Sequence, residues 1–268
     1  MRSTVALKSS TGAQYARLLS VAGTRGSRVV TNEEMCTMID STPEWIEQRT
    51  GITERRWVAG GEDAETLGVD AASKAIERAG LQRSDIDAII VSTVSHFQQT
   101  PSLACILAER LGLGAPAAFD ISAACAGFCY GVSMAESMVR AGSATNVLVV
   151  GVETLSKYTD ITDRSTAFLI SDGAGAVVVG PSTEPAIGPT VWGSKPEAAR
   201  VIEIDDWRQL EGETGPHIHM EGREVFKWAT TAIVEKAVET LEASGLTPEE
   251  LDCFIPHQAN NRITDSML

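Results

Sequence analysis

The chain has 268 residues, of which 43% are apolar and 22% are charged, and its formal net charge is −14. A chain of this length and apolar content can bury a sizeable core, so a globular enzyme of one large domain or two closely packed ones is the default class. The negative charge argues against nucleic acid and anionic membranes as partners, because long-range repulsion slows encounter with a polyanion.

Cysteine usage bears on the cellular compartment. The five cysteines are odd in number and mostly far apart, which argues against a disulfide framework or a metal knuckle: Cys36, Cys105, Cys125, Cys129 and Cys253. The N-terminal stretch lacks the continuous apolar core of a secretory signal, and the longest apolar runs are too short to span a membrane. We therefore expect a protein of the reducing cytoplasm, with no membrane partner.

In chain order, the first strong pattern is an amphipathic helix over 64–79, with apolar residues at spacings of three and four, Asp63 at its start and Gly80 at its end. A nearly unbroken β-branched run follows in "DIDAIIVSTVS" and predicts a strand covered on both faces. The runs "NVLVVGVE" and "GAGAVVVG" have the same character after further helical stretches. Alternating helices and buried strands predict the α/β fold class.

An internal repeat divides the chain. Residues 77–92, "ERAGLQRSDIDAIIVS", align with residues 242–257, "EASGLTPEELDCFIPH", at a separation of 165 positions. The repeat predicts two copies of a helix–strand unit, one in a half spanning 1–180 and one in a half spanning 181–268. Only 11 residues follow the second copy, so we expect that half to lack its last helix and strands, which would leave apolar faces of strands such as "LDCFIP" uncovered.

The stretch "AACAGFCYG" holds the candidate nucleophile. Cys125 follows an apolar strand-like segment and precedes a helical stretch that ends at Gly142, which predicts a place in the first turn of that helix. Unpaired backbone N–H groups there stabilise a thiolate and lower its pKa. Cys129 lies one turn deeper and lacks this advantage. By spacing alone, a cysteine among alanines and glycines is more often a small core residue, so the assignment depends on context.

Four separated motifs supply that context. "EWIEQRTGI", "DISAACAGF", "DRSTAFLISDGAGAVVVG" and "PHQANNRI" occur in this order. Together they resemble the β-ketoacyl-acyl carrier protein synthase III family of condensing enzymes, within the thiolase-like superfamily. The resemblance runs from about Arg28 to the last residue. It implies a duplicated five-layer α-β-α-β-α fold, which agrees with the repeat, with the second half incomplete.

The resemblance also implies a reaction. Cys125 corresponds to the nucleophile that an acyl-CoA starter acylates, and His257 corresponds to a catalytic partner. Decarboxylative Claisen condensation with malonyl-acyl carrier protein then starts fatty acid or polyketide synthesis. Acyl-CoA is a substrate, no cofactor is required, and the family's active form is a homodimer. The family's catalytic asparagine corresponds to about position 290, 165 residues after Cys125, so we expect the chain as written to fold poorly and not to condense.

Further positions follow from the resemblance. Trp45 and Arg164 match the pair that brackets the CoA adenine, and Arg49 stands where a guanidinium can meet a CoA phosphate. A core or interface aromatic for Trp45 and an ordinary surface ion pair for Arg49 are the alternatives. Gly222 and Phe226 match the pocket wall, although a packing role explains the same residues.

Two more regions concern the substrates. Thr100 stands where some members carry a phenylalanine that closes the acyl pocket of the facing subunit, so the smaller side chain predicts acceptance of branched starters as well as acetyl. Arg262 corresponds to an arginine that helps to dock the acidic carrier protein, within the segment Gln258, Ala259, Asn260, Asn261 and Arg262. Its charge would be a local exception to the unfavourable net field.

Other readings stay open. A truncated, non-condensing remnant that binds CoA thioesters or only self-acylates is the main alternative, and a Cys/His hydrolase is a more distant one. His217 and His219 offer two potential metal ligands, but no third ligand cluster is adjacent, and we assign no metal. The glycines of "DGAGAVVVG" precede a strand, whereas those of a dinucleotide-binding loop follow one, so we expect a packing role for them.

Overall fold

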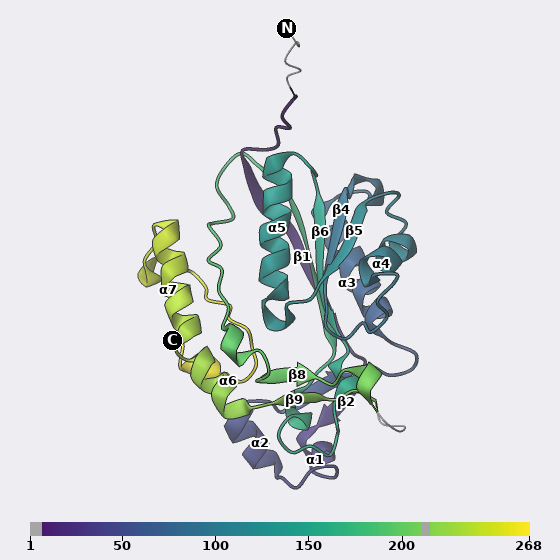
Figure 1. Cartoon of the computed structure of the whole chain (residues 1–268), viewed down its shortest axis with the longest axis vertical. Coiled ribbons are helices and arrows are strands. Elements are labelled where there is room, and N and C mark those ends of the chain that lie inside the picture. Colours follow the sequence, from purple (N-terminus) through teal and green to yellow (C-terminus); the bar gives the residue numbers. More distant parts are fainter. Residues whose placement is uncertain (1–6, 211–214) are drawn as a thin grey trace. The chain divides into compact units, whose positions relative to one another are not determined.

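The chain divides into two compact units in this computed structural model, which describes residues 7–210 and 215–268 (Figure 1). Unit 1 comprises the chain up to Thr24, Glu65–Val152 and Ala174–Ile187, and unit 2 comprises Arg25–Ala64, Glu153–Gly173 and Gly188–Leu268. The boundary predicted between residues 180 and 181 comes from the sequence repeat. A division of the chain into compact units does not test that boundary, so it stays a prediction. None of the helices in the described ranges has the length and apolar content needed to cross a membrane.

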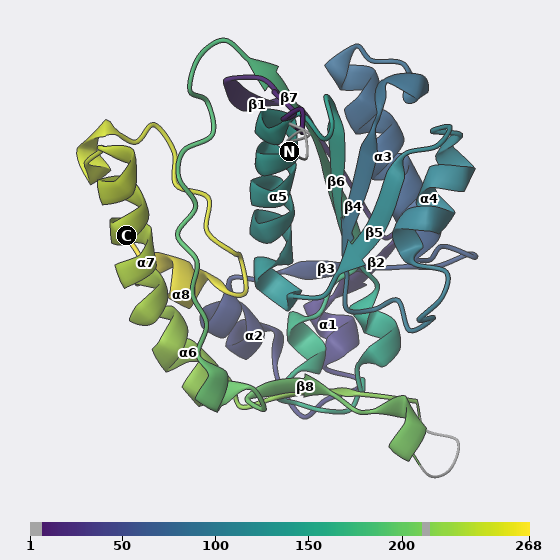
Figure 2. The ribbon, with the colours of Figure 1, turned by 45° about the horizontal axis from the view of Figure 1, so that its top comes forward.

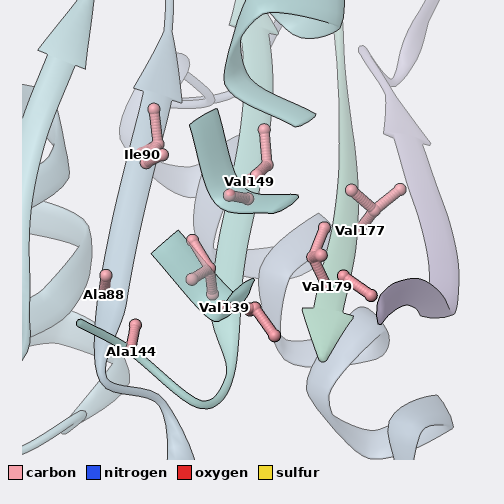
Figure 3. Close-up of a cluster of buried hydrophobic side chains, with 10 residues drawn as sticks. Ala88, Ile90, Val139, Ala144, Val149, Val177 and Val179 are labelled. Atoms are coloured by element: carbon pink, nitrogen blue, oxygen red, sulfur yellow. The ribbon is translucent and has the colours of Figure 1, made fainter. Parts of the chain in front are cut away.

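A five-stranded sheet forms the centre of unit 1. β4 is parallel to both of its neighbours, with Ile90 opposite Phe119 on one side and Val149 on the other. Figure 3 shows β7, which carries Val177 and Val179, running in the opposite direction to β4. In spatial order the strands are β1 (Tyr15–Arg25), β7 (Gly173–Ser182), β6 (Val147–Glu153), β4 (Ala88–Ser92) and β5 (Ala117–Ile121).

Helices cover both faces of this sheet. Figures 1 and 2 show α5 (Gly127–Ala141) on one face and α3 (Ala64–Ala79) with α4 (Leu103–Leu111) on the other. Every residue of β4 is buried, as the unbroken apolar run predicts for a strand covered twice. The predicted helix and the three predicted strands of this unit are therefore confirmed, and α3 ends before Gly80 in the left-handed conformation at φ +70°.

The core of unit 1 on the α5 side is built from small and β-branched side chains (Figure 3). Val139 of α5 lies with Ile90, Val149, Val177 and Val179, and all five are at most 2% exposed. Burying each side chain of this size contributes about 1.5–3 kcal/mol to stability. Such short side chains fill the space only if the helix lies close to the strands.

Close approach depends on glycine within α5. A Cβ atom added at Gly131 would lie 2.7 Å from Cγ1 of Val149 in β6, closer than real Cβ contacts allow. A larger residue would therefore push the helix away from the sheet. The start of α4 is held by a side chain of β5, because both carboxylate oxygens of Asp120 accept backbone N–H groups of Leu103 and Ala104, at 2.7 and 2.8 Å. Asp120 thus caps a helix distant from it in sequence.

Unit 2 contains two strand pairs and several helices. β2 pairs with β3, and β8 pairs with β9, both antiparallel. A separate apolar core packs around Met35, Ile46, Trp57 and Phe168. The elements are β2 (Arg28–Thr31), α1 (Asn32–Met35), α2 (Pro43–Thr50), β3 (Glu54–Trp57), β8 (Ile202–Ile204), β9 (Ile218–Met220), α6 (Gly222–Ala229), α7 (Ala232–Ser244) and α8 (Asn261–Asp265).

Asp172 fastens three segments of unit 2 together. Its buried carboxylate accepts the backbone N–H groups of Val58, at 2.8 Å, and Ser156, at 2.9 Å, as well as the Ser156 hydroxyl. Its carbonyl also accepts the N–H of Gly26. A buried carboxylate needs such donors, because an unsatisfied charge in the interior is costly. These bonds anchor the segment 153–173 to β3.

The repeat is only partly visible in the fold. α7 ends before Gly245 at φ +69°, and a 3-10 turn follows at Pro248–Glu250, 165 positions after the matching turn Arg83–Asp85 that follows α3. The expected second strand does not form: "LDCFIP" is irregular coil with a bend at Asp252, and Ile255 is 80% exposed. β4 hydrogen-bonds to two neighbouring strands, whereas residues 251–256 pair with no strand among the described residues. Without a neighbouring strand, the backbone groups of a strand would lack hydrogen-bond partners, so the segment does not form one.

We expect Gly131→Ala to lower the free energy of unfolding by about 1–3 kcal/mol, because the overlap with Val149 forces α5 outward. This exceeds the gain of up to about 1 kcal/mol from alanine's better helix propensity. The urea concentration at the midpoint of unfolding measures the net change in stability. Gly215→Ala is the control, since no atom lies within 4 Å of the added Cβ. A Gly131→Ala midpoint equal to or above that of wild type would contradict the packing argument.

Candidate active site

In unit 1, Cys125 lies in a 3-10 turn, Ala124–Ala126, between the end of β5 and the start of α5. Cys125 is exposed. The preceding residue, Ala124, has φ +45°, a left-handed conformation that residues other than glycine rarely adopt. Such a conformation costs on the order of 1–3 kcal/mol and is maintained only where surrounding structure enforces it. The turn therefore presents the thiol at a fixed point.

The first residue of α5, Gly127, lies in close contact with the sheet. A Cβ atom at Gly127 would lie 1.9 Å from Oγ of Ser92, the last residue of β4. The start of α5 therefore rests directly on the carboxyl end of β4. No side chain caps this helix, so its partial positive charge is directed toward the turn and favours an anion there. Cys125 lies two residues before Gly127, the first residue of α5, so it precedes the first helical turn, in which the sequence placed it.

Two other predicted positions belong to unit 1. Cys129 is exposed and is the third residue of α5, so it lies within the first turn of the helix, whereas the sequence placed it one turn deeper. Thr100 is exposed in the loop before α4, and its carbonyl accepts a hydrogen bond from Nε2 of Gln98 at 3.0 Å. Their roles stay predictions.

In unit 2, three of the residues expected to bind CoA, Trp45, Arg49 and Arg164, meet around one indole. The guanidinium carbon of Arg164 lies 4.9 Å from the centroid of the Trp45 ring, and that of Arg49 lies 5.5 Å from it. Phe168 packs edge-on against Trp45, with centroids 5.5 Å apart and an interplanar angle of 82°. Trp45 and Arg49 are one turn apart on α2, whereas Arg164 comes from a loop more than a hundred residues away. Each cation–π contact contributes about 0.5–1 kcal/mol at an exposed site.

His257 lies in unit 2, in the coil that precedes α8. The residue as a whole is exposed, yet partial burial of its ring lowers the pKa of His257, because desolvation disfavours the imidazolium. The neutral ring is thus the main form near neutral pH, with one N–H donor available. Asn260 caps α8, its side chain accepting the backbone N–H of Ile263 at 3.1 Å.

The segment after His257 contacts the helix that carries Trp45. α8 packs against α2, and a Cβ atom at Gly51, just past the end of α2, would lie 2.0 Å from Nδ2 of Asn261. Arg262 stacks over the ring of Phe226 in α6, at 5.5 Å from its centroid. Gly222, the first residue of α6, has no neighbour within 4 Å of an added Cβ. The structure thereby joins the predicted CoA-binding and carrier-protein-binding residues within one unit.

Sequence reasoning did not single out Asp163 or Phe168. Phe168 is buried and supports Trp45, while the Asp163 carboxylate bonds to Ser165 and Thr166 beside Arg164. The order Asp-x-Ser-Thr is typical of a side chain that bonds to the following turn, and this pattern could have revealed Asp163. The edge-on contact of Phe168 leaves no such local pattern.

The predicted histidine pair lies on and before β9. Nε2 of His219 is 2.9 Å from Oδ1 of Asp205, and Asp205 also accepts the backbone N–H of His217 at 2.9 Å. These bonds lower the pKa of Asp205, the backbone bond from His217 most strongly. Across residues 7–210 and 215–268, no three His, Cys, Asp or Glu side chains group as a metal site.

Comparison with known proteins identifies the family. Residues 119–196 match the family described as 3-oxoacyl-[acyl-carrier-protein (ACP)] synthase III. The chain is 52% identical to β-ketoacyl-[acyl-carrier-protein] synthase III 1 of Streptomyces coelicolor, over 98% of this chain and 80% of that protein.

Solved structures agree. The priming β-ketosynthase of the R1128 polyketide pathway matches with a TM-score of 0.94 and 42% identity, over 99% of this chain and 80% of that one. The 3-oxoacyl-[acyl-carrier-protein] synthase III of Aquifex aeolicus VF5 matches with a TM-score of 0.88 and 38% identity, over 94% and 79%. The fold is thus thiolase-like α/β, as predicted, and the chain belongs to the β-ketoacyl-[acyl-carrier-protein] synthase III family of condensing acyltransferases.

Proposed function

We propose that this chain condenses a short or branched acyl-CoA starter with malonyl-acyl carrier protein and so initiates fatty acid or polyketide synthesis. The observation that carries the proposal is the position of Cys125, on a strained turn at the uncapped start of α5. Family membership over nearly the whole chain supports the same reaction. No cofactor enters the proposed chemistry, and acyl-CoA is a substrate.

The first step is acyl transfer to the thiol. The Cys125 thiolate attacks the thioester carbonyl of acyl-CoA, a tetrahedral oxyanion forms, and the CoA thiolate leaves and takes up a proton. The positive end of α5 favours the attacking thiolate. One thioester replaces another, so the step is nearly isoenergetic and the acyl group stays reactive.

The second step forms a carbon–carbon bond. Malonyl-acyl carrier protein loses carbon dioxide, the electron pair of the broken bond forms an enolate, and the enolate carbon attacks the acyl carbonyl on Cys125. The Cys125 thiolate leaves, and the product is a β-ketoacyl thioester on the carrier protein. His257 in its neutral form donates a hydrogen bond to the enolate oxygen, which stabilises the charge as carbon dioxide departs.

Binding of the CoA nucleotide and of the carrier protein is assigned to unit 2. The adenine of CoA stacks on Trp45 once the Arg164 guanidinium, which lies 4.9 Å from the ring centroid, draws back to cover the base, and Arg49 meets a phosphate. Gly222 and Phe226 form part of the pocket wall. The carrier protein docks on 258–262, where Arg262 offers a positive charge in a chain whose net charge is −14.

The wider setting is also part of the proposal. The working form is a homodimer in the cytoplasm. The thiols of Cys36, Cys105, Cys129 and Cys253 are free, which fits a reducing compartment. The alternative is a protein that binds CoA thioesters without condensing them. This alternative, and with it the expectation that the chain as written does not condense, is not favoured, since the relatives that match 98% of the chain are named as synthases.

Incubation with acetyl-CoA is expected to acylate Cys125 and not Cys129, because Cys125 lies on the turn toward which the positive end of α5 is directed, whereas Cys129 lies within the helix. Peptide mass mapping locates the label. Cys125→Ala should abolish it, and the matched variant Cys129→Ala should keep it. Label on Cys129, or undiminished label in Cys125→Ala, would refute the assignment of the nucleophile.

His257→Ala is expected to separate the two steps. Loss of a donor to the enolate oxygen should slow carbon dioxide release from malonyl-acyl carrier protein by about 100- to 1000-fold. Acylation of Cys125 should stay within about threefold of wild type, because that step uses the start of α5. Mass spectrometry follows the acyl-enzyme, and a carbon dioxide assay follows decarboxylation. Equal losses in both assays would remove His257 from a role specific to condensation.

The Thr100 side chain is expected to let the acyl pocket accept branched starters. Thr100→Phe should lower the acylation rate with isobutyryl-CoA by at least about tenfold relative to acetyl-CoA, since a larger side chain fills space that the branch needs. Acylation rates for the two CoA thioesters in wild type and variant give this ratio, and Thr100→Ser serves as the control. A wild-type enzyme that strongly prefers acetyl-CoA would count against the prediction.

A further inference from the structure

The loop that carries Arg164 is organised by the carboxylate of the preceding residue, Asp163. Oδ1 of Asp163 accepts the backbone N–H of Ser165 at 2.8 Å. The Ser165 hydroxyl lies 2.7 Å from both carboxylate oxygens of Asp163. Oδ2 accepts the hydroxyl of Thr166 at 2.6 Å. The Asp163 carbonyl accepts the N–H of Ala167 at 3.0 Å, which closes the turn. One carboxylate therefore holds the two residues that follow Arg164.

Because the Asp163 carboxylate bonds to Ser165 and Thr166, the Arg164 guanidinium contacts a group other than Asp163. Asp163 and Arg164 are adjacent and of opposite charge, yet no ion pair between Arg164 and a carboxylate is present in the described parts of the chain. The acceptor sites of Asp163 are directed to Ser165 and Thr166 instead. The guanidinium accordingly lies over the Trp45 ring, 4.9 Å from its centroid.

Both sides of this stack are anchored in the same core. Thr166 is 2% exposed, so its bond to Asp163 ties the turn to a buried point. Two residues later, Phe168 belongs to the apolar core of unit 2 and contacts the edge of Trp45. The position of Arg164 relative to Trp45 therefore depends on the few bonds between Asp163 and Thr166.

We propose that Asp163 is a positioning residue, which holds the turn that carries Arg164 beside Trp45 so that the guanidinium can close over a base stacked on Trp45, and which thereby sets the affinity for the adenine end of CoA. The proposal rests on the proposed function, in which Trp45 and Arg164 bracket that base. Asp163 acts through Arg164 and touches no reacting atom. Its loss should weaken binding of the nucleotide end and leave the chemistry at the thioester unchanged.

Asp163→Asn tests this with little change in volume. The amide oxygen still accepts one bond, but the amide nitrogen cannot accept a hydroxyl, so the hold on Ser165 or Thr166 is lost. We expect KM for acetyl-CoA to rise about tenfold, or about 1.4 kcal/mol, with kcat within about twofold. With acetyl-pantetheine, which lacks the nucleotide, both constants should stay within about twofold of wild type.

Three further variants distinguish a positioning role of Asp163 from a general effect on folding. Asp160→Asn alters a carboxylate in the same loop that bonds to Thr162, and it should leave the KM for acetyl-CoA within about twofold. Thr166→Val removes the hydroxyl that bonds to Asp163 at nearly constant shape, and should raise that KM severalfold. Thr166→Ser keeps the hydroxyl and should restore it. A merely structural role would not distinguish acetyl-CoA from acetyl-pantetheine.

The outcomes are decisive for each claim. Equal effects of Asp163→Asn on the two thioesters, or no effect on either, would overturn the positioning role. Calorimetric titration with CoA keeps the test independent of turnover: the Kd for CoA should rise about tenfold in Asp163→Asn and stay unchanged in Asp160→Asn. A wild-type chain that binds CoA but is never acylated would refute the proposed reaction alone. A wild-type chain that does not bind CoA would overturn the positioning role as well.

Discussion

The close approach of α5 to the sheet is the constraint on which the nucleophile's position depends. Gly127 rests on Ser92 and Gly131 on Val149, and a side chain at either position would push the helix outward. Because the helix starts directly against the end of β4, the chain from β5 must turn within a few residues, and Ala124 takes a left-handed conformation to do so. Packing energy in the core thus maintains a strained turn that presents Cys125.

Unit 2 shows a second use of packing, in which a rigid aromatic support fixes a surface site. Trp45 is held by the edge of Phe168, so its faces remain suited to stacking with guanidinium groups or a flat base. α2 has two roles here, since it carries Trp45 near its start and contacts Asn261 of α8 just past its end. The residues assigned to the two substrates are therefore mechanically connected within this unit.

Charge is distributed to suit acidic ligands despite the overall sign. The chain carries −14 overall, yet Arg49, Arg164 and Arg262 each lie over an aromatic ring, within a unit that also contains His257. An arginine stacked on an aromatic face keeps its positive charge and its N–H donors available to a ligand. In an arginine paired with a carboxylate, the charge is partly neutralised and some N–H donors are already used. Such local cations bind and orient anionic groups that the net field would repel.

Local sequence patterns predicted α3, β4, β6 and β7 and placed Cys125 at the start of a helix. Each of these follows from periodicity, β-branched runs or glycine at a helix end, which act within a few residues. The tertiary structure alone decided which indole Arg164 stacks on and that Phe168 supports it, because these contacts join segments more than a hundred residues apart. It also decided that "LDCFIP" is not a strand: a β-branched or apolar run becomes a strand only where neighbouring strands satisfy its backbone, and that condition is not written in the run itself.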